Sequence, residues 1–139
     1  MDFPFITATT ASILAFLQVF LGLLVGFKRL KHKVGIGDGG NEVLARQIRV
    51  HGNLIENAPI FLILLLLLEL ANTNKLIVVI IGAVFVLGRI SHAYALSQTT
   101  NPLTPLRAVG GLGNNLAIIV TAAMIFHHIF SGTYLNVLP

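Results

Sequence analysis

The amino-acid sequence predicts an all-α integral membrane protein, built as a bundle of four transmembrane helices. Of its 139 residues, 55% are hydrophobic and only 10% are charged, whereas soluble proteins carry about 25% charged residues. A water-soluble chain of this length could not bury so much apolar surface. The apolar residues also form four segments, each close to the roughly 20 residues that a helix needs to span a bilayer. We therefore expect one membrane domain that covers residues 1–139.

The four segments are joined by short connections. The expected helices cover residues 5–27, 43–70, 75–97 and 106–131. The first connection, VGIGDGGN, is rich in glycine, and its last residue, Asn41, can cap the N-terminus of the second helix. The second connection, ANTN, is a tight link, and the flanking Glu69 and Lys75 are expected to be solvated. Pro105 suits the first turn of the fourth helix.

The distribution of basic residues predicts the orientation. Four of the nine Lys and Arg residues lie between Lys28 and Lys33, directly after the first apolar segment. Beside a membrane span, such a cluster is a topology signal, and we expect no nucleic-acid partner. Because basic loops stay in the cytoplasm, both termini are expected on the other side, N-out and C-out, with the lipid bilayer around the bundle.

Polar residues interrupt the second and third apolar segments. At about 100° per residue, five of them share one helix face, in a stripe about 80° wide. These five are Glu42, Arg46, Arg49, Asn53 and Glu56. In the next helix, Arg89 and His92 are three residues apart and share a face. Charges inside a bilayer are expensive, so they pair, face the interior or line a pocket. Since cations exceed carboxylates here, we interpret the stripe as the wall of an anion-binding pocket.

Other interpretations of these residues remain open. Arg46 could instead extend to the lipid headgroups, and the whole stripe could be structural. A small exporter built around one membrane carboxylate is another class, but the arginines near Glu56 argue against it. The chain has no cysteine, and the adjacent His127 and His128 point to different faces of their helix. We therefore expect no metal site.

Two motifs resemble a known family. The pattern RxxxNxxExxP at residues 49–59, followed by GRxxH at residues 88–92, resembles the MAPEG family, the membrane-associated proteins in eicosanoid and glutathione metabolism. The stretches KHKVGIGDGGN and IRVHGNLIENAP are most similar to its bacterial, uncharacterised branch. The resemblance covers essentially the whole chain. It implies a homotrimer in the bacterial inner (plasma) membrane, with glutathione bound as co-substrate at each subunit interface.

The resemblance also implies roles for individual residues. Together with the polar stripe, it gives these candidate glutathione-binding residues: Arg29 (or Lys28), Arg46, Arg49, Asn53, Glu56, Arg89, His92 and Tyr94. Arg107, at the start of the fourth helix, matches the arginine that stabilises the glutathione thiolate, and it is the candidate catalytic residue. Better-known members carry a tyrosine where this chain has Leu96, and Tyr94 is the nearest tyrosine.

The implied activity is that of a glutathione transferase or peroxidase acting on lipophilic electrophiles. A free thiol has a pKa of about 8.5, which nearby arginine or lysine lowers, and the thiolate is the nucleophile. Because the chain has no cysteine, the sulfur must come from the co-substrate. The second substrate would be a lipophilic small molecule that arrives from the bilayer. The alternative is a non-catalytic membrane protein that binds an anionic ligand or a lipid headgroup.

Overall fold

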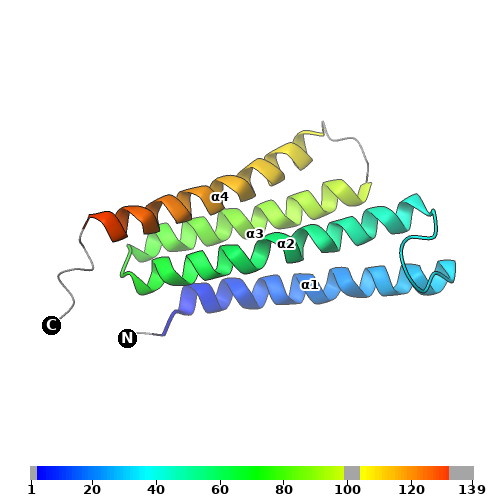
Figure 1. Ribbon diagram of the computed structural model, residues 1–139, viewed down its shortest axis with the longest axis horizontal. Helices are drawn as coiled ribbons and strands as arrows, with labels where there is room; N and C mark the ends of the chain where they lie inside the picture. The colour runs from blue at the N-terminus through cyan, green and yellow to red at the C-terminus, as the bar shows by residue number, and fades with distance from the viewer. Residues whose placement is uncertain (1–2, 99–103, 132–139) are drawn as a thin grey trace.

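The computed structural model describes residues 3–98 and 104–131 and shows four α-helices, each long and apolar enough to cross a membrane. They are α1 (Phe5–His32), α2 (Glu42–Leu70), α3 (Lys75–Gln98) and α4 (Pro105–Phe130). The described part of the chain contains no strand. The start of α1 and the end of α4 lie at one end of the bundle, and the loop of residues 33–41 lies at the other (Figure 1). The predicted all-α, four-helix fold class is confirmed, while the N-out, C-out orientation stays a prediction.

The helix ends follow local capping chemistry. The side chain of Asn41 accepts a hydrogen bond from the backbone N–H of Leu44 at 3.0 Å, as predicted for the N-cap of α2. Pro105 is the first residue of α4. The predicted end of α1 at residue 27 is wrong, because the helix continues to His32 and stops where Lys33 adopts a left-handed conformation, φ 55°. Most of the basic cluster is therefore helical.

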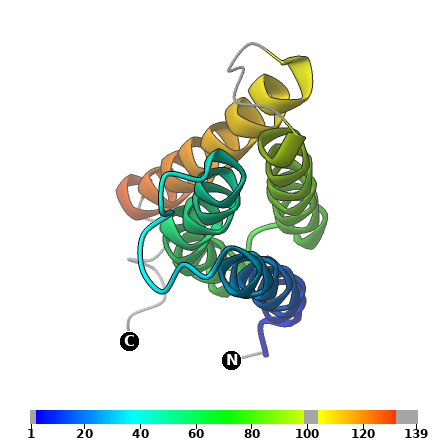
Figure 2. The same cartoon turned by 90° about the vertical axis from the view of Figure 1, so that its right-hand side faces the viewer.

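The core of the bundle is centred on α2. Its buried residues recur every three or four positions, from Leu44 to Leu68, so one helix face packs inward. α2 packs against the other three helices, whereas α1 and α4 do not pack against each other. The rings of Phe61 and Phe85 stack with centroids 3.7 Å apart and join α2 to α3. Viewed from the end that carries the 33–41 loop, the start of α4 lies far from α1 (Figure 2).

α3 and α4 come into close backbone contact at a glycine. A Cβ atom on Gly110 would lie 2.8 Å from the backbone nitrogen of His92 and 2.9 Å from the carbonyl oxygen of Gly88. The fully buried side chain of Asn114 lies against Gly88 and donates a hydrogen bond to the carbonyl of Gly110 at 2.6 Å. Small residues are the usual means by which membrane helices come this close. This crossing holds the first turns of α4 against the end of α3.

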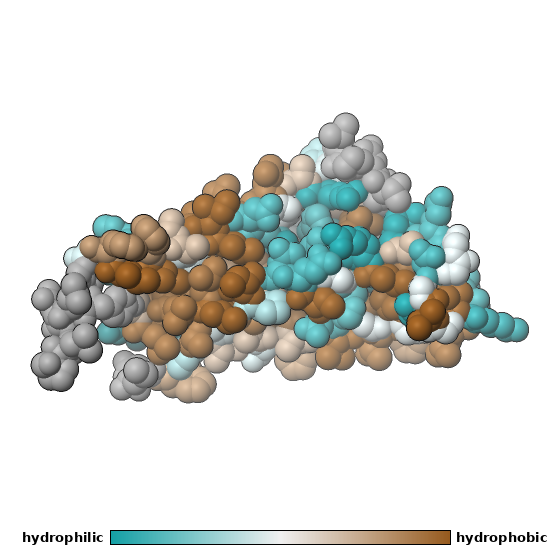
Figure 3. Space-filling view, viewed as in Figure 1, coloured by the Kyte–Doolittle hydropathy of each residue, from teal (hydrophilic) through white to brown (hydrophobic). Residues whose placement is uncertain are grey.

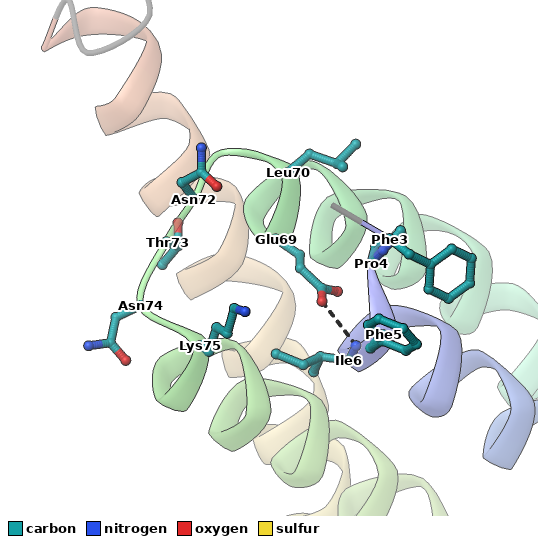
Figure 4. Close-up of a pocket in the computed structure, with 10 residues that line it drawn as sticks. All are labelled: Phe3, Pro4, Phe5, Ile6, Glu69, Leu70, Asn72, Thr73, Asn74 and Lys75. Carbon is teal, nitrogen blue, oxygen red and sulfur yellow. Dashed lines mark hydrogen bonds between the residues drawn. The ribbon is translucent and has the colours of Figure 1, made fainter. Parts of the chain in front are cut away.

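Glu69, near the end of α2, caps the N-terminus of α1. Its carboxylate accepts hydrogen bonds from the backbone N–H groups of Ile6 at 2.9 Å and Thr7 at 2.7 Å. Figure 4 shows this carboxylate pointing toward the first turn of α1, in a cavity of about 380 Å³ at the end of the bundle. The residue before α1, Pro4, provides no side-chain cap of its own. The expectation that Glu69 is simply solvated is wrong, because a carboxylate here satisfies two otherwise unpaired donors.

Candidate functional site

The polar residues of the spanning helices gather in one half of the molecule. Figure 3 shows hydrophilic residues over α2 and below the start of α4, in the half nearer to the 33–41 loop. The half of this face nearer to the chain ends is mostly hydrophobic. The sequence distribution explains the division, because the polar stripe of α2 ends at Glu56 and an almost wholly apolar run follows from Pro59 to Leu68.

The clearest charged feature is an ion pair on α2. A guanidinium nitrogen (Nη1) of Arg49 lies 2.8 Å from a carboxylate oxygen of Glu56, two helical turns further on. The two side chains are 60% and 53% exposed. The pair therefore lies on the outer face of α2 and not in the interior of this chain's bundle.

A groove of about 380 Å³ runs beside this ion pair. Residues from the glycine-rich loop and from the first half of α2 form it together. The lining residues are Gly37, Asp38, Ala45, Ile48, Arg49, Gly52 and Glu56. The contribution of the loop was not predicted from the sequence, because VGIGDGGN was interpreted only as a turn. The available signal was the N-cap at Asn41, since a loop that ends in a cap at the start of α2 lies beside the first turns of that helix.

A second pair of polar residues joins α2 to α3. Arg89 is only 4% exposed, and its Nη1 donates to the backbone carbonyl of Asn53 at 3.0 Å and to the side-chain oxygen of Asn53 at 2.5 Å. Its guanidinium carbon also lies 5.3 Å from the centre of the Phe85 ring. Both oxygens are neutral, and no carboxylate among the described residues forms an ion pair with Arg89. The bundle thus holds a buried cation beside the outward ion pair.

His92 and Arg107 meet where α3 and α4 converge. The Nδ1–H of the His92 ring donates to the backbone carbonyl of Arg107 at 3.2 Å. Between the residues that directly precede these two, the hydroxyl of Ser91 donates to the carbonyl of Leu106 at 3.1 Å. The two bonds fix the start of α4 relative to α3. They therefore also fix the backbone position of Arg107, whose side chain is half-buried.

Three other candidates lie in different surroundings. Arg46 approaches the exposed Glu42 at 4.0 Å, while its Nε is buried without a hydrogen-bond partner. Arg29 donates from Nη1 to the carbonyl of Gly37 at 2.7 Å, so it holds the loop that forms one wall of the groove. Tyr94 is 61% exposed, and within the described chain its hydroxyl makes no hydrogen bond. A single chain therefore does not bring Tyr94 to the ion pair.

The arrangement provides charge of both signs around an open groove. Arg49 can bind a carboxylate, where the planar guanidinium offers two parallel donors, and Glu56 can accept an ammonium group. Arg89 and His92 hold Asn53 and the start of α4 in place. An ion pair on the outer face of a spanning helix is expensive in lipid. This face is therefore suited to contact with a ligand or another subunit.

Comparison with known proteins agrees with the family that the sequence motifs resemble. The sequence model of the MAPEG family matches residues 7–127. Inner membrane protein YecN of Escherichia coli strain K12 is 39% identical over 66 residues, which is 48% of this chain and 50% of that protein. The protein of the same name from Escherichia coli O6:H1, strain CFT073, matches equally. The chain thus spans about half the length of the curated relatives it matches. With the four apolar helices, these likenesses confirm an integral protein of the inner membrane. Because the family match covers most of the sequence, the chain belongs to the MAPEG family.

Proposed function

We propose that this protein binds glutathione in the groove beside α2 and acts as a glutathione transferase or peroxidase on lipophilic electrophiles. Family membership suggests a glutathione-related membrane protein, and the outward ion pair of Arg49 and Glu56 carries the finer proposal. Few ligands make use of a cation and a carboxylate held 2.8 Å apart on a spanning helix. Glutathione does, because it carries two carboxylates and one ammonium group.

The groups around the groove match the ends of the peptide. Arg49 would bind a carboxylate in a forked geometry, and Glu56 would accept the glutamyl ammonium group. Asn53 would be oriented by Arg89, which holds both its backbone and its side-chain oxygen. Arg89 itself adds positive potential from a position that is nearly closed to solvent. The excess of positive charge around the groove favours a ligand of net negative charge.

Arg107 is the proposed partner of the thiolate. Positive groups near a thiol favour the thiolate and lower its pKa. The thiolate then attacks the electrophilic carbon of the second substrate, the carbon–sulfur bond forms, and the leaving group departs with the bond's electron pair. Arg107 stands at the start of α4, where His92 fixes its backbone. Arg46 and Arg29 would add charge at the same end of the bundle.

Assembly as a homotrimer is part of the proposal. In one chain, more than half of each of the side chains of Arg49 and Glu56 is exposed, on a helix that spans the membrane. A neighbouring subunit against this face would remove the ion pair from lipid and would close the groove on its open side. The neighbour would then also bring its own exposed Tyr94 to the ligand. Native mass spectrometry in mild detergent tests the subunit number.

The activity is tested with the detergent-purified protein. Titration calorimetry measures glutathione binding, and ultraviolet absorbance measures thiolate formation against pH. We expect Arg49→Gln to weaken glutathione binding by at least tenfold, because a charged hydrogen bond contributes about 1.5–3 kcal/mol. Lys75→Gln removes the same charge at the far end of the bundle and should leave binding unchanged. If the unaltered protein does not bind glutathione, the proposal is wrong.

One observation favours the non-catalytic alternative. Leu96, at the position of the family tyrosine, is 5% exposed and packs in the hydrophobic core. The hydroxyl that other members place there is therefore absent from this site. If the protein binds glutathione but produces neither thiolate absorbance nor conjugation of a reactive aryl halide, it is an anion-binding or headgroup-binding membrane protein.

A further inference from the structure

A second groove lies at the other side of the 33–41 loop, along the end of α1. It has a volume of about 650 Å³ and is formed by the last turns of α1 and the first residues of the loop. Leu23, Phe27 and Leu30 line it, and they are 55%, 65% and 76% exposed. Their spacing of four and three residues places them on one face of the helix. None of these residues belongs to the glutathione groove described above.

Two glycines keep this groove open. A Cβ atom on Gly26 or on Gly35 would meet no atom of another residue within 4 Å. Both glycines line the groove, one in the helix and one in the loop. A glycine inside a helix lowers its stability by about 0.5–1 kcal/mol relative to alanine, and close packing, the usual reason for it, does not apply to Gly26. The empty space beside it is instead suited to an occupant from outside the chain.

Basic residues close the polar end of the same groove. Arg29 and Lys33 line it, and Lys28 and Lys31 lie on the same two turns of α1. Lys33 terminates the helix in a left-handed conformation, which leaves its side chain at the junction of helix and loop. The groove is therefore apolar along its length and positively charged at one end. Within residues 28–33 there is no acidic residue to neutralise this charge.

We propose that this groove binds an anionic phospholipid, with an acyl chain along Leu23, Phe27 and Leu30 and the phosphate beside Lys33 and Arg29. Clusters of four or more basic residues at the end of a spanning helix attract anionic headgroups, with about 1 kcal/mol from each residue near the surface. The apolar groove leads from the membrane-spanning part of α1 to this cluster, so its shape and its charge both match those of an anionic lipid. Gly37, whose carbonyl accepts the hydrogen bond of Arg29, also lines the α2 groove, so the bound lipid would lie next to that site. The proposal does not depend on glutathione binding.

Native mass spectrometry tests this site with the whole protein. The protein is mixed with phosphatidylglycerol and phosphatidylcholine of identical acyl chains, in equal amounts, and the retained lipid is counted as collision energy rises. We expect selective retention of phosphatidylglycerol. Lys33→Asn should reduce it about fivefold, the equivalent of about 1 kcal/mol, and asparagine tolerates the left-handed conformation. Gly26→Leu places a side chain in the groove, at a position where a Cβ would meet nothing within 4 Å, and should reduce retention at least as much.

Matched controls separate the groove from general effects. Gly113→Leu introduces the same side chain into α4, at a glycine whose Cβ would also meet nothing within 4 Å. Lys75→Asn removes the same charge at the opposite end of the bundle. Both variants should retain phosphatidylglycerol as the unaltered protein does. Size-exclusion profiles confirm that each variant is folded, and if Gly26→Leu is not, Lys33→Asn decides alone.

Three results would overturn the proposal. Equal retention of the two lipids by the unaltered protein would show that headgroup charge is not recognised. Selective retention that survives Lys33→Asn would place the lipid elsewhere on the surface. Release of phosphatidylglycerol by millimolar inorganic phosphate, with no effect of added phosphatidylcholine, would show that the basic end binds a soluble anion and that the apolar groove contributes nothing.

Discussion

Removal of the Glu69 carboxylate should loosen α1 from the rest of the bundle. Glu69→Ala leaves the backbone N–H groups of Ile6 and Thr7 without an acceptor, at a helix end that Pro4 does not cap. A hydrogen bond to a charged group contributes about 1.5–3 kcal/mol. Glu69 is half-buried, so water replaces part of the two bonds. We therefore expect a net loss of about 2–3 kcal/mol of unfolding free energy.

Thermal unfolding in detergent, followed by circular dichroism, measures this loss. A loss of this size should lower the melting temperature by roughly 5–10 °C. Glu69→Gln keeps one carbonyl acceptor, so its melting temperature should lie between those of the unaltered protein and Glu69→Ala. Glu42→Ala is the matched control, because that carboxylate is 88% exposed and its distance to Arg46 is 4.0 Å, and an exposed pair contributes at most about 1 kcal/mol. If Glu69→Ala and Glu42→Ala lower the melting temperature equally, the capping argument is refuted.

Three further predictions concern packing, assembly and orientation. Gly110→Ala puts a Cβ 2.8 Å from backbone atoms of α3 and should lower the unfolding free energy by about 1–3 kcal/mol; equal stability in a denaturant series would contradict this close contact. Glu56→Gln leaves Arg49 unneutralised at the proposed subunit interface and should lower both the trimer fraction in native mass spectrometry and glutathione affinity, about tenfold for the latter; an undiminished trimer fraction would speak against the interface. Cysteines at Gly37 and Asn72 should react with impermeant reagents from opposite sides of the inner membrane, Gly37 from the cytoplasm; a reversed pattern would overturn the N-out, C-out prediction.

The fold was largely predictable from the sequence because a bilayer sets the length of each span. Four mainly apolar segments of sufficient length predict four spanning helices, even though polar residues interrupt two of them. The end of α1 was not predictable in the same way. Hydropathy falls at Lys28, yet the helix continues to His32, because lysine and arginine are good helix formers. The left-handed residue that ends it is Lys33, and neither glycine nor asparagine marks that position.

The site was predictable where it depends on one helix and less so where it depends on several. Helical periodicity alone places Arg49 and Glu56 on one face, and the 2.8 Å contact agrees with this. Periodicity also gives the face of Arg89 but not its partner, since the register of two helices is set by packing. The role of Glu69 depends on how two helix ends meet in space, and no local pattern of sequence encodes that.

The division of α2 into two chemical halves has a consequence for the proposed reaction. The half before Glu56 faces the groove and carries the charges that a water-soluble tripeptide requires. The half after Pro59 is almost entirely apolar, as is the surrounding face of the molecule (Figure 3). A lipophilic electrophile dissolved in the bilayer can therefore approach along the apolar half, while the thiol enters from the loop side. The two reactants would meet at the depth of Glu56, where lipid ends and the charged stripe begins. A shift of the stripe by one turn toward Pro59 would place the charges in lipid. The proposed chemistry therefore depends on the position of this boundary as much as on the identity of the arginines.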